Sequence, residues 1–442
     1  MKIQLSDSFT YKKLLRFTLP SILMLVFSSI YGVVDGVFVS NFAGETPFAA
    51  LNFIFPFIMM LGAFGFMLAA GGSALISKTM GEGDMKKAKS LFSLVIYVSI
   101  ALGIVLATLG IIFIRPIASL LGAEGEMLEY SVIYGRILLA ALPAFMLQME
   151  FQTFFVMVEK PQLGLYFTLG AGIANMVLDA LLVGILPFGL VGAAMATVIS
   201  QCIGGILPLI YFAFPNTSLM RLGKAKFDGR ALLKICTNGS SELLSNISMS
   251  LVGMLYNIQL LKYAGEQGVA AYGVLMYVNF VFISMFIGYV VGVAPIISFH
   301  YGAGNTSELK SLLRKSIILI SVSSVAMLLI SEALAQPFSM IFASKSPALF
   351  EMTLRGFRIY SFSFLFAGFA IFGSSFFTAL NDGLTSAIIS FMRTLVFQTG
   401  AVIILPLIWE LDGIWMSIIV AELMAVVVTA IFMVVKKKRF KY

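Results

Sequence analysis

Four oxygen-bearing side chains in otherwise apolar stretches could bind a hard cation or an exchangeable proton. They are Asp35, Asn175, Asp179 and Thr197. Asn175 and Asp179 stand four residues apart, so on a helix they share one face. Asp35, Asp179 and Thr197 lie at similar depths when residues are counted from the end of each stretch that is on the side opposite the N-terminus. Carboxylate, amide and hydroxyl oxygens are ligands that hard cations such as Na⁺ prefer, and two close carboxylates favour retention of a proton.

An ionisable side chain inside a bilayer is rare because it costs about 2.5–3.5 kcal/mol on insertion scales. Asp35 and Asp179 are therefore candidates for binding Na⁺ or H⁺, with Asn175 and Thr197 completing the shell of oxygen ligands. The alternative is that nearby backbone or hydroxyl groups satisfy each acid separately.

Two further residues are candidates for roles beside this cluster. Pro20 precedes Asp35 in the same apolar stretch, and proline can kink a helix because it removes a backbone hydrogen bond. Such a kink could respond to protonation of Asp35 as a gate, or it could be a static bend. Glu242 could contact a second cation or a cationic substrate, or it could be a carboxylate near a helix start.

The stretches that must position these residues are long and apolar. The chain of 442 residues is 60% hydrophobic and 11% charged, with a mean hydropathy of +1.01, so too few charges remain to coat a soluble fold. About 20 apolar residues cross a bilayer as a helix. The sequence therefore predicts an all-α integral membrane protein with twelve transmembrane helices, at 14–40, 48–77, 91–114, 130–156, 162–186, 191–214, 233–261, 269–299, 316–336, 352–379, 384–408 and 413–435.

The second half of the chain repeats the first at an offset of 221 residues, so that Gly81 corresponds to Gly302. With six spans in each half, both halves have the same orientation, which predicts a parallel repeat of two six-helix lobes. We expect an N-terminal lobe at 1–214, a cytoplasmic linker at 215–232, and a C-terminal lobe with a basic tail at 233–442. Substrate sites usually lie between such halves.

Basic residues gather on one side of the predicted membrane. Of the 29 Lys and Arg residues, 22 fall on the side of the N-terminus, six fall on the other side or its helix ends, and Arg393 lies within a span. Cytoplasmic loops carry the excess of basic residues. The sequence therefore predicts a multi-pass protein of the cell membrane with both termini in the cytoplasm.

Motifs for ATP hydrolysis and for acid–base or metal catalysis are absent from the sequence. There is no GxxxxGK[ST], HExxH or GxSxG, and His300 is the only histidine. Cys202 and Cys236 have no CxxC or histidine companion, which argues against a metal site or a disulfide framework. We therefore expect no enzymatic activity, no nucleic-acid partner and no cofactor beyond a coupling ion.

Several motifs together resemble the multidrug and toxic compound extrusion (MATE) family over nearly the whole chain. They are Pro20 followed by Asp35, the AlaAsnMetValLeuAsp stretch at 174–179, the glycine-rich stretch at 188–197, and the strings SALISKTMGEGD at 73–84 and APIISFHYGAGN at 294–305. The resemblance implies two lobes around a central cavity that opens alternately to each side. It also implies that inward movement of Na⁺ or H⁺ drives drug export.

In relatives, the cation site of the N-terminal lobe uses residues that correspond to Asp35, Asn175, Asp179 and Thr197, which agrees with the cluster above. One branch of the family carries a further acid in the tenth span, and 373–380 of this chain has none. A second cation site of that type is therefore not expected, although Glu242 keeps the question open.

We accordingly expect a secondary antiporter that exports amphipathic and cationic compounds in exchange for Na⁺ or H⁺, functioning as a monomer within membrane lipid. The alternative is a flippase of lipid-linked saccharides, which shares this architecture. A flippase should have a basic cavity for a pyrophosphate, whereas the charge inside these spans is mainly acidic. A scaffold or receptor has no use for clustered acids, and a channel needs a filter-like loop.

Overall fold

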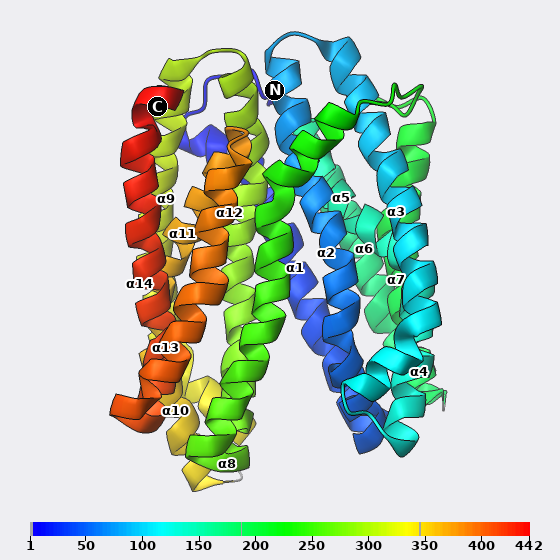
Figure 1. Ribbon diagram of the computed structural model, residues 1–442, viewed down its shortest axis with the longest axis vertical. Coiled ribbons are helices and arrows are strands. Elements are labelled where there is room, and N and C mark those ends of the chain that lie inside the picture. The colour runs from blue at the N-terminus through cyan, green and yellow to red at the C-terminus, as the bar shows by residue number, and fades with distance from the viewer. Residues whose placement is uncertain (1–2, 187, 344–345) are drawn as a thin grey trace.

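The computed structural model describes residues 3–186, 188–343 and 346–442, and within these ranges helices are joined by short connections (Figure 1). The first half contains α1 (Tyr11–Phe42), α2 (Glu45–Gly81), α3 (Met85–Leu120), α4 (Gly125–Ala140), α5 (Leu142–Met157), α6 (Pro161–Asp179), the π-helical η1 (Ala180–Ile185) and α7 (Gly189–Ala213). The second half contains α8 (Gly229–Gly302), α9 (Thr306–Ala343), α10 (Pro347–Ser361), α11 (Phe364–Ala379), α12 (Gly383–Phe391), the π-helical η2 (Met392–Phe397), α13 (Gln398–Ile404) and α14 (Pro406–Phe440).

These elements account for twelve membrane crossings. In the described ranges, nine helical segments are long and apolar enough to cross a membrane. The bent pairs α4–α5 and α10–α11, with bends of 55° and 48°, each form one more span. α8 has 74 residues and leaves helical geometry at Gly265, where φ is 62° and ψ is −157°, so it holds two spans instead of one. The all-α membrane fold with twelve spans is thereby confirmed.

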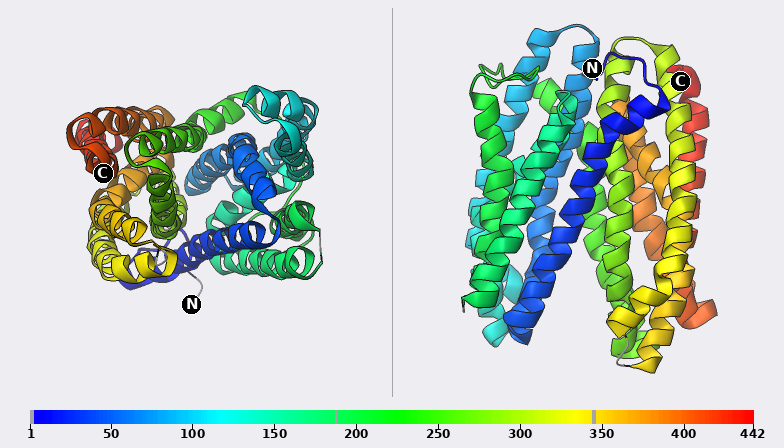
Figure 2. Two further views of the ribbon diagram at one scale, coloured as in Figure 1. Left: turned by 90° about the horizontal axis from the view of Figure 1, so that it is seen from below. Right: turned by 180° about the vertical axis from the view of Figure 1, so that it is seen from behind.

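The helices form two bundles that stand side by side (Figures 1 and 2). α1–α7 form one bundle, which we call the N lobe, and α8–α14 form the other, which we call the C lobe. The connection between the lobes runs through residues 214–228, between the end of α7 and the start of α8. α1 and α2 of the N lobe pack against α8 of the C lobe.

Irregularities in the two lobes occupy corresponding positions. The break between α4 and α5 lies at Ala141, and the break between α10 and α11 begins at Phe362, which is 221 residues further along the chain. Pro116 inside α3 and Pro337 inside α9 stand at the same offset. The repeat in the sequence is therefore also a repeat of local backbone structure.

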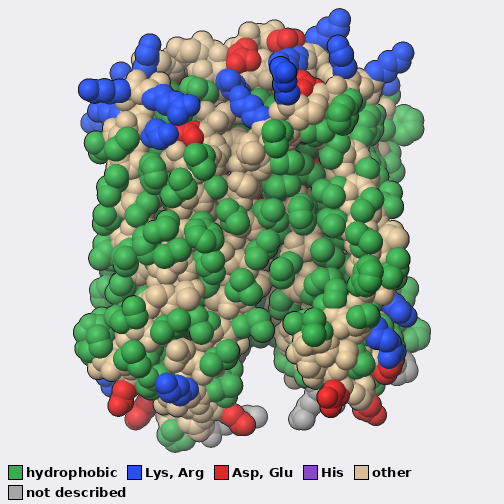
Figure 3. Space-filling model, viewed as in Figure 1, with side chains coloured by type: hydrophobic (Ala, Val, Ile, Leu, Met, Phe, Trp, Pro, Cys, Tyr) green, Lys and Arg blue, Asp and Glu red, His purple; other side chains and the backbone are tan. Residues whose placement is uncertain are grey.

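Lys and Arg side chains gather at the end of the molecule where both chain termini lie (Figures 1 and 3). We call this end the basic end. At the opposite end, the space-filling view shows a hollow between the two lobes, whereas the lobes meet at the basic end (Figure 3). The structure is therefore open between the lobes at one end only.

Close backbone contacts join the lobes toward the basic end. A Cβ atom built on Gly81 would lie 2.0 Å from the carbonyl oxygen of Phe299, and one built on Gly302 would lie 2.0 Å from that of Lys78. The two contacts correspond to each other at the 221-residue offset of the repeat. Only glycine lets two backbones approach this closely, so these positions set how tightly the lobes close.

Candidate functional site

The carboxyl groups of Asp35 and Asp179 face each other inside the N lobe. Asp35 lies on α1, which packs against α6, and Asp179 is the last residue of α6. The two side chains are in direct contact. Asp179 is 0% exposed and Asp35 is half-buried. The structure thus brings together the two acids that the sequence places at similar depth.

Hydrogen-bond donors are missing around this pair within the part of the chain that the structure describes. Oδ1 of Asp35 and both carboxyl oxygens of Asp179 are buried without a hydrogen-bond partner. Two ionised carboxylates in contact repel each other strongly in a low-dielectric interior. A shared proton or a bound cation removes this repulsion. The geometry is therefore suited to holding one exchangeable positive charge.

The helix that carries Asp179 also presents Asn175. Asn175 lies one turn earlier on the same face of α6, is buried, and has an Oδ1 atom that receives no hydrogen bond from the described residues. Directly after Asp179 the backbone changes to the π-helical turn η1, and such turns are frequent at functional sites. α6 thus offers an amide oxygen and a carboxylate beside the carboxylate of Asp35.

Thr197 lies on α7, which packs against α6, and its side chain is half-buried. Within the described ranges, no hydrogen bond joins Thr197 to Asp35, Asn175 or Asp179. The structure therefore brings Asp35 and Asp179 together, keeps Asn175 one turn from Asp179 on α6, and puts Thr197 on the neighbouring helix.

Two tyrosines next to the acid pair were not predicted from the sequence. Tyr134, on α4, is buried and close enough to both Asp35 and Asp179 for electrostatic interaction. Tyr31, on α1, lies one turn before Asp35 and contacts Gln148 of α5. The spacing of four residues from Asp35 could have pointed to Tyr31, whereas nothing in the sequence distinguishes Tyr134 from the other tyrosines.

Pro20 lies in the part of α1 that packs against the C lobe. It is buried, and α1 remains one helix from Tyr11 to Phe42 across it. Its neighbours Thr18 and Ile22 contact glycines of α8, since a Cβ atom on Gly288 would lie 2.5 Å from Cα of Ile22. Pro20 therefore occupies a tight contact between the lobes, on the helix that carries Asp35.

Glu242 lies on α8 in the C lobe, beside a second group of charged side chains within the spans. Its side chain is half-buried and interacts electrostatically with Arg393. Arg393 itself donates hydrogen bonds of 2.7–3.0 Å to both carboxyl oxygens of Glu422, whose side chain is 2% exposed. Arg393 is thus already paired with one acid, and Glu242 is a second acid beside it.

The C lobe has no copy of the aspartate pair. Under the repeat, Tyr256 corresponds to Asp35, and Gly400 corresponds to Asp179. Tyr256 is buried and stacks on Tyr272 with ring centroids 5.3 Å apart. The two lobes therefore share a fold but differ in charge. The pair of carboxyl groups that could hold an exchangeable cation belongs to the N lobe.

Comparisons with known proteins agree with this architecture. The sequence profile of the MatE family matches residues 20–181 and 243–402, which is one match in each lobe. The multidrug export protein MepA of Staphylococcus haemolyticus (strain JCSC1435) is 26% identical over 419 residues, which cover 94% of this chain and 91% of MepA.

Solved structures match over nearly the full length. A MATE crystallised in complex with MaL6 has a TM-score of 0.93 and 22% sequence identity, with 98% of each chain covered. The outward-facing conformation of a multidrug resistance MATE family transporter of the MOP superfamily has a TM-score of 0.92 and 23% identity, with 98% of this chain and 97% of that chain covered. These structures share the fold of the present chain.

Proposed function

Because the chain belongs to the MatE family of multidrug efflux transporters, which are not enzymes, we propose that it is a secondary antiporter that exports amphipathic and cationic compounds in exchange for Na⁺ or H⁺. The observation that carries this proposal is the contact between Asp35 and Asp179 without hydrogen-bond donors in the described part of the chain. Such a pair is stable with one positive charge between the carboxyl groups and unstable without it. Binding and release of that charge can therefore be coupled to a change in the protein.

The acid pair lies in the half of the N lobe that is nearer to the open end. Asp35 is seven residues from Phe42, the end of α1, which is about 10 Å along a helix axis at 1.5 Å per residue. A cation that enters the hollow therefore has a short path to the site. Once bound, it neutralises the pair and lowers the cost of closing the lobes around it.

The basic end faces the cytoplasm in this proposal, since basic loops stay on the cytoplasmic side. Both termini and the linker at 215–232 are then cytoplasmic, and the hollow opens to the outside of the cell membrane. Alternating access follows if the lobes at 1–214 and 233–442 rock against each other. Each chain has both lobes and the acid pair, so one chain is sufficient for the cycle.

The remaining residues take roles that fit their positions. Asn175 and Thr197 complete the oxygen shell of a bound Na⁺ after a small approach of α7, and Pro20 transmits a change at Asp35 to the contact with the C lobe. Glu242 contacts a cationic substrate or a second cation, because of the two acids beside Arg393 it is the one that is not hydrogen-bonded to it.

Gradient-driven transport tests this function. Inside-out vesicles that contain the protein are supplied with a fluorescent lipophilic cation and, separately, with a pH gradient or a Na⁺ gradient. The proposal predicts uptake with at least one gradient. No gradient-driven uptake by folded protein would favour the lipid-linked saccharide flippase, which is disfavoured here because Glu422 already neutralises Arg393.

A further inference from the structure

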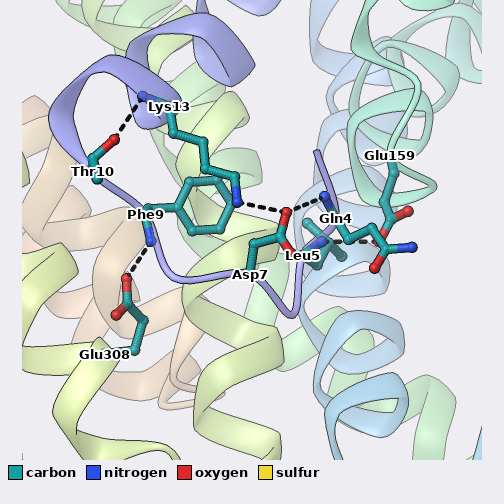
Figure 4. Close-up of polar contacts among 8 residues, drawn as sticks. All are labelled: Gln4, Leu5, Asp7, Phe9, Thr10, Lys13, Glu159 and Glu308. Carbon is teal, nitrogen blue, oxygen red and sulfur yellow. Dashed lines mark hydrogen bonds and ion pairs between the residues drawn. The ribbon is translucent and has the colours of Figure 1, made fainter. Parts of the chain in front are cut away.

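A segment before the first helix crosses from one lobe to the other at the basic end (Figures 2 and 4). We call residues 3–10 the N-terminal strap. The backbone N–H of Leu5 donates a hydrogen bond of 2.9 Å to Oε1 of Glu159, in the turn between α5 and α6 of the N lobe. The backbone N–H of Phe9 donates one of 2.9 Å to Oε1 of Glu308, in the first turn of α9 of the C lobe. One carboxylate from each lobe therefore holds the strap.

Buried side chains strengthen both attachments. Leu5 is 0% exposed and Phe9 is 1% exposed, although both precede the first helix. Nζ of Lys315, one of the basic residues of α9, also donates a hydrogen bond to the carbonyl oxygen of Phe9. The C lobe therefore holds both backbone groups of Phe9, through Glu308 and Lys315.

Asp7, between the two attachments, ties the strap to residues on either side of them. Asp7 accepts a hydrogen bond of 2.9 Å from the backbone N–H of Gln4 and pairs with Lys13 at 2.7 Å (Figure 4). Burial opposes ionisation of Asp7, but the Gln4 amide and the Lys13 ammonium outweigh it and hold the pKa of Asp7 below its usual value. Thr10 caps the start of α1 by accepting a hydrogen bond from the backbone N–H of Lys13.

The residue that holds the strap on the N lobe has an unusual backbone. Glu159 has a φ of +62°, which non-glycine residues seldom adopt. Its carboxylate is nevertheless directed at the strap instead of solvent, and the residue is 9% exposed. The turn between α5 and α6 thus keeps a strained residue at the position where it reaches Leu5.

The length of the strap limits how far the lobes can part. Phe9, which the C lobe holds, lies two residues before Tyr11, where α1 of the N lobe begins, and two fully extended residues span at most about 7 Å. We propose that the N-terminal strap is a latch that holds the basic end closed, and that its contact with Glu308 and Lys315 of the C lobe must break before that end opens. This inference rests on the proposed alternating access between the lobes.

The attachment to the C lobe distinguishes a latch from ordinary packing. The strap continues through Thr10 into α1 of the N lobe, so loss of the contact between Leu5 and Glu159 leaves it attached to both lobes. Loss of the contact between Phe9 and Glu308 weakens its attachment to the C lobe. A latch therefore predicts that loss of Glu308 opens the basic end, whereas loss of Glu159 has little effect.

The test measures the distance between the lobes at the basic end in the full-length protein. Cys202→Ala and Cys236→Ala remove the native thiols, and spin labels are placed at Lys86→Cys on α3 and Lys310→Cys on α9. Distance distributions are recorded in nanodiscs without substrate or gradient. Glu159→Ala, Glu308→Ala and their combination are compared with Glu82→Ala, which removes an exposed acid of the basic end that pairs with Lys78.

A latch predicts that Glu308→Ala raises the ratio of open to closed molecules by about tenfold, the ratio expected for one charge-assisted hydrogen bond. The double variant should match Glu308→Ala, and both Glu159→Ala and Glu82→Ala should match the parent. Glu308→Gln keeps the side-chain volume and should give a smaller shift if Glu308→Ala does not fold. Unchanged distances in folded Glu308→Ala, or an equal shift in Glu159→Ala, would overturn the latch.

This result is independent of the coupling ion, because no gradient is applied. If vesicles show no cation-coupled export while Glu308→Ala opens the basic end, the antiporter proposal fails and the latch stands. If export is coupled while Glu308→Ala leaves the distances unchanged, the latch fails and the antiporter proposal stands.

Discussion

Gly81 of the N lobe packs directly against the carbonyl oxygen of Phe299 in the C lobe. A methyl group at Gly81 would lie 2.0 Å from that oxygen, so Gly81→Ala should force the lobes apart at the basic end. Overpacking of this kind typically costs about 1–3 kcal/mol. We expect the spin-label distance between positions 86 and 310 to shift toward longer values.

Gly170→Ala is the matched control for this substitution. It lies in α6, and a Cβ atom there would have nothing within 4 Å. Its distance distribution should equal that of the parent protein. An unchanged distribution in Gly81→Ala would show that the basic end is not closed through this contact.

The membrane fold follows from the sequence because long apolar stretches and a 221-residue repeat leave few alternatives. The bends were not predicted. The break at Phe362 has no proline beside it. Its position can be inferred only from the 221-residue repeat, which relates it to the break at Ala141. The N-terminal strap was equally hidden, since Leu5 and Glu159 are 154 residues apart and interact only in the folded protein.

The buried pair of Arg393 and Glu422 should be important for the stability of the C lobe. Loss of Glu422 leaves the half-buried Arg393 with only Glu242 beside it, and breaking a buried pair costs up to about 3–5 kcal/mol. Glu422→Ala should therefore lower the midpoint of thermal unfolding in detergent. The double variant Arg393→Met with Glu422→Leu should recover most of that loss, whereas an unchanged midpoint in Glu422→Ala would mean that the pair contributes little.

Glu242 should discriminate between substrates by charge. If its carboxylate contacts a cationic substrate, Glu242→Gln should weaken binding of a fluorescent cation about tenfold, or about 1.4 kcal/mol, and leave a neutral amphipathic compound unaffected. Fluorescence titration of purified protein measures both. Glu266→Gln, at an exposed position of α8, is the control. Equal losses for the two compounds in Glu242→Gln would indicate a structural role.

Asn175 should report which ion is coupled. Its Oδ1 atom is an additional ligand for Na⁺ but is not needed to hold a proton between two carboxyl groups. In a Na⁺-coupled protein, Asn175→Ala should raise the half-activating Na⁺ concentration about tenfold. In an H⁺-coupled protein, the same variant should retain transport driven by a pH gradient.

The candidate site was predicted in part because buried acids in apolar helices are conspicuous. The pairing of Asp35 and Asp179 could be predicted from their depths alone, and helix periodicity placed Asn175 on the same face as Asp179. The position of Tyr134 beside the pair could not be predicted, since depth does not tell which face of α4 points to the site. The predicted role of Thr197 stays a prediction, because Thr197 lies on the neighbouring helix α7 and no hydrogen bond among the described residues joins it to the two acids.

The central claim is that the pair of Asp35 and Asp179 carries the coupling ion. The most direct test is uptake of a fluorescent cation into inside-out vesicles under a pH gradient or a Na⁺ gradient, with parent protein, Asp179→Asn and the exposed-acid control Glu124→Gln. We expect parent and control to accumulate the cation under the coupling gradient, and Asp179→Asn to show no gradient-driven uptake at equal expression. Full gradient-driven uptake by Asp179→Asn would contradict the claim.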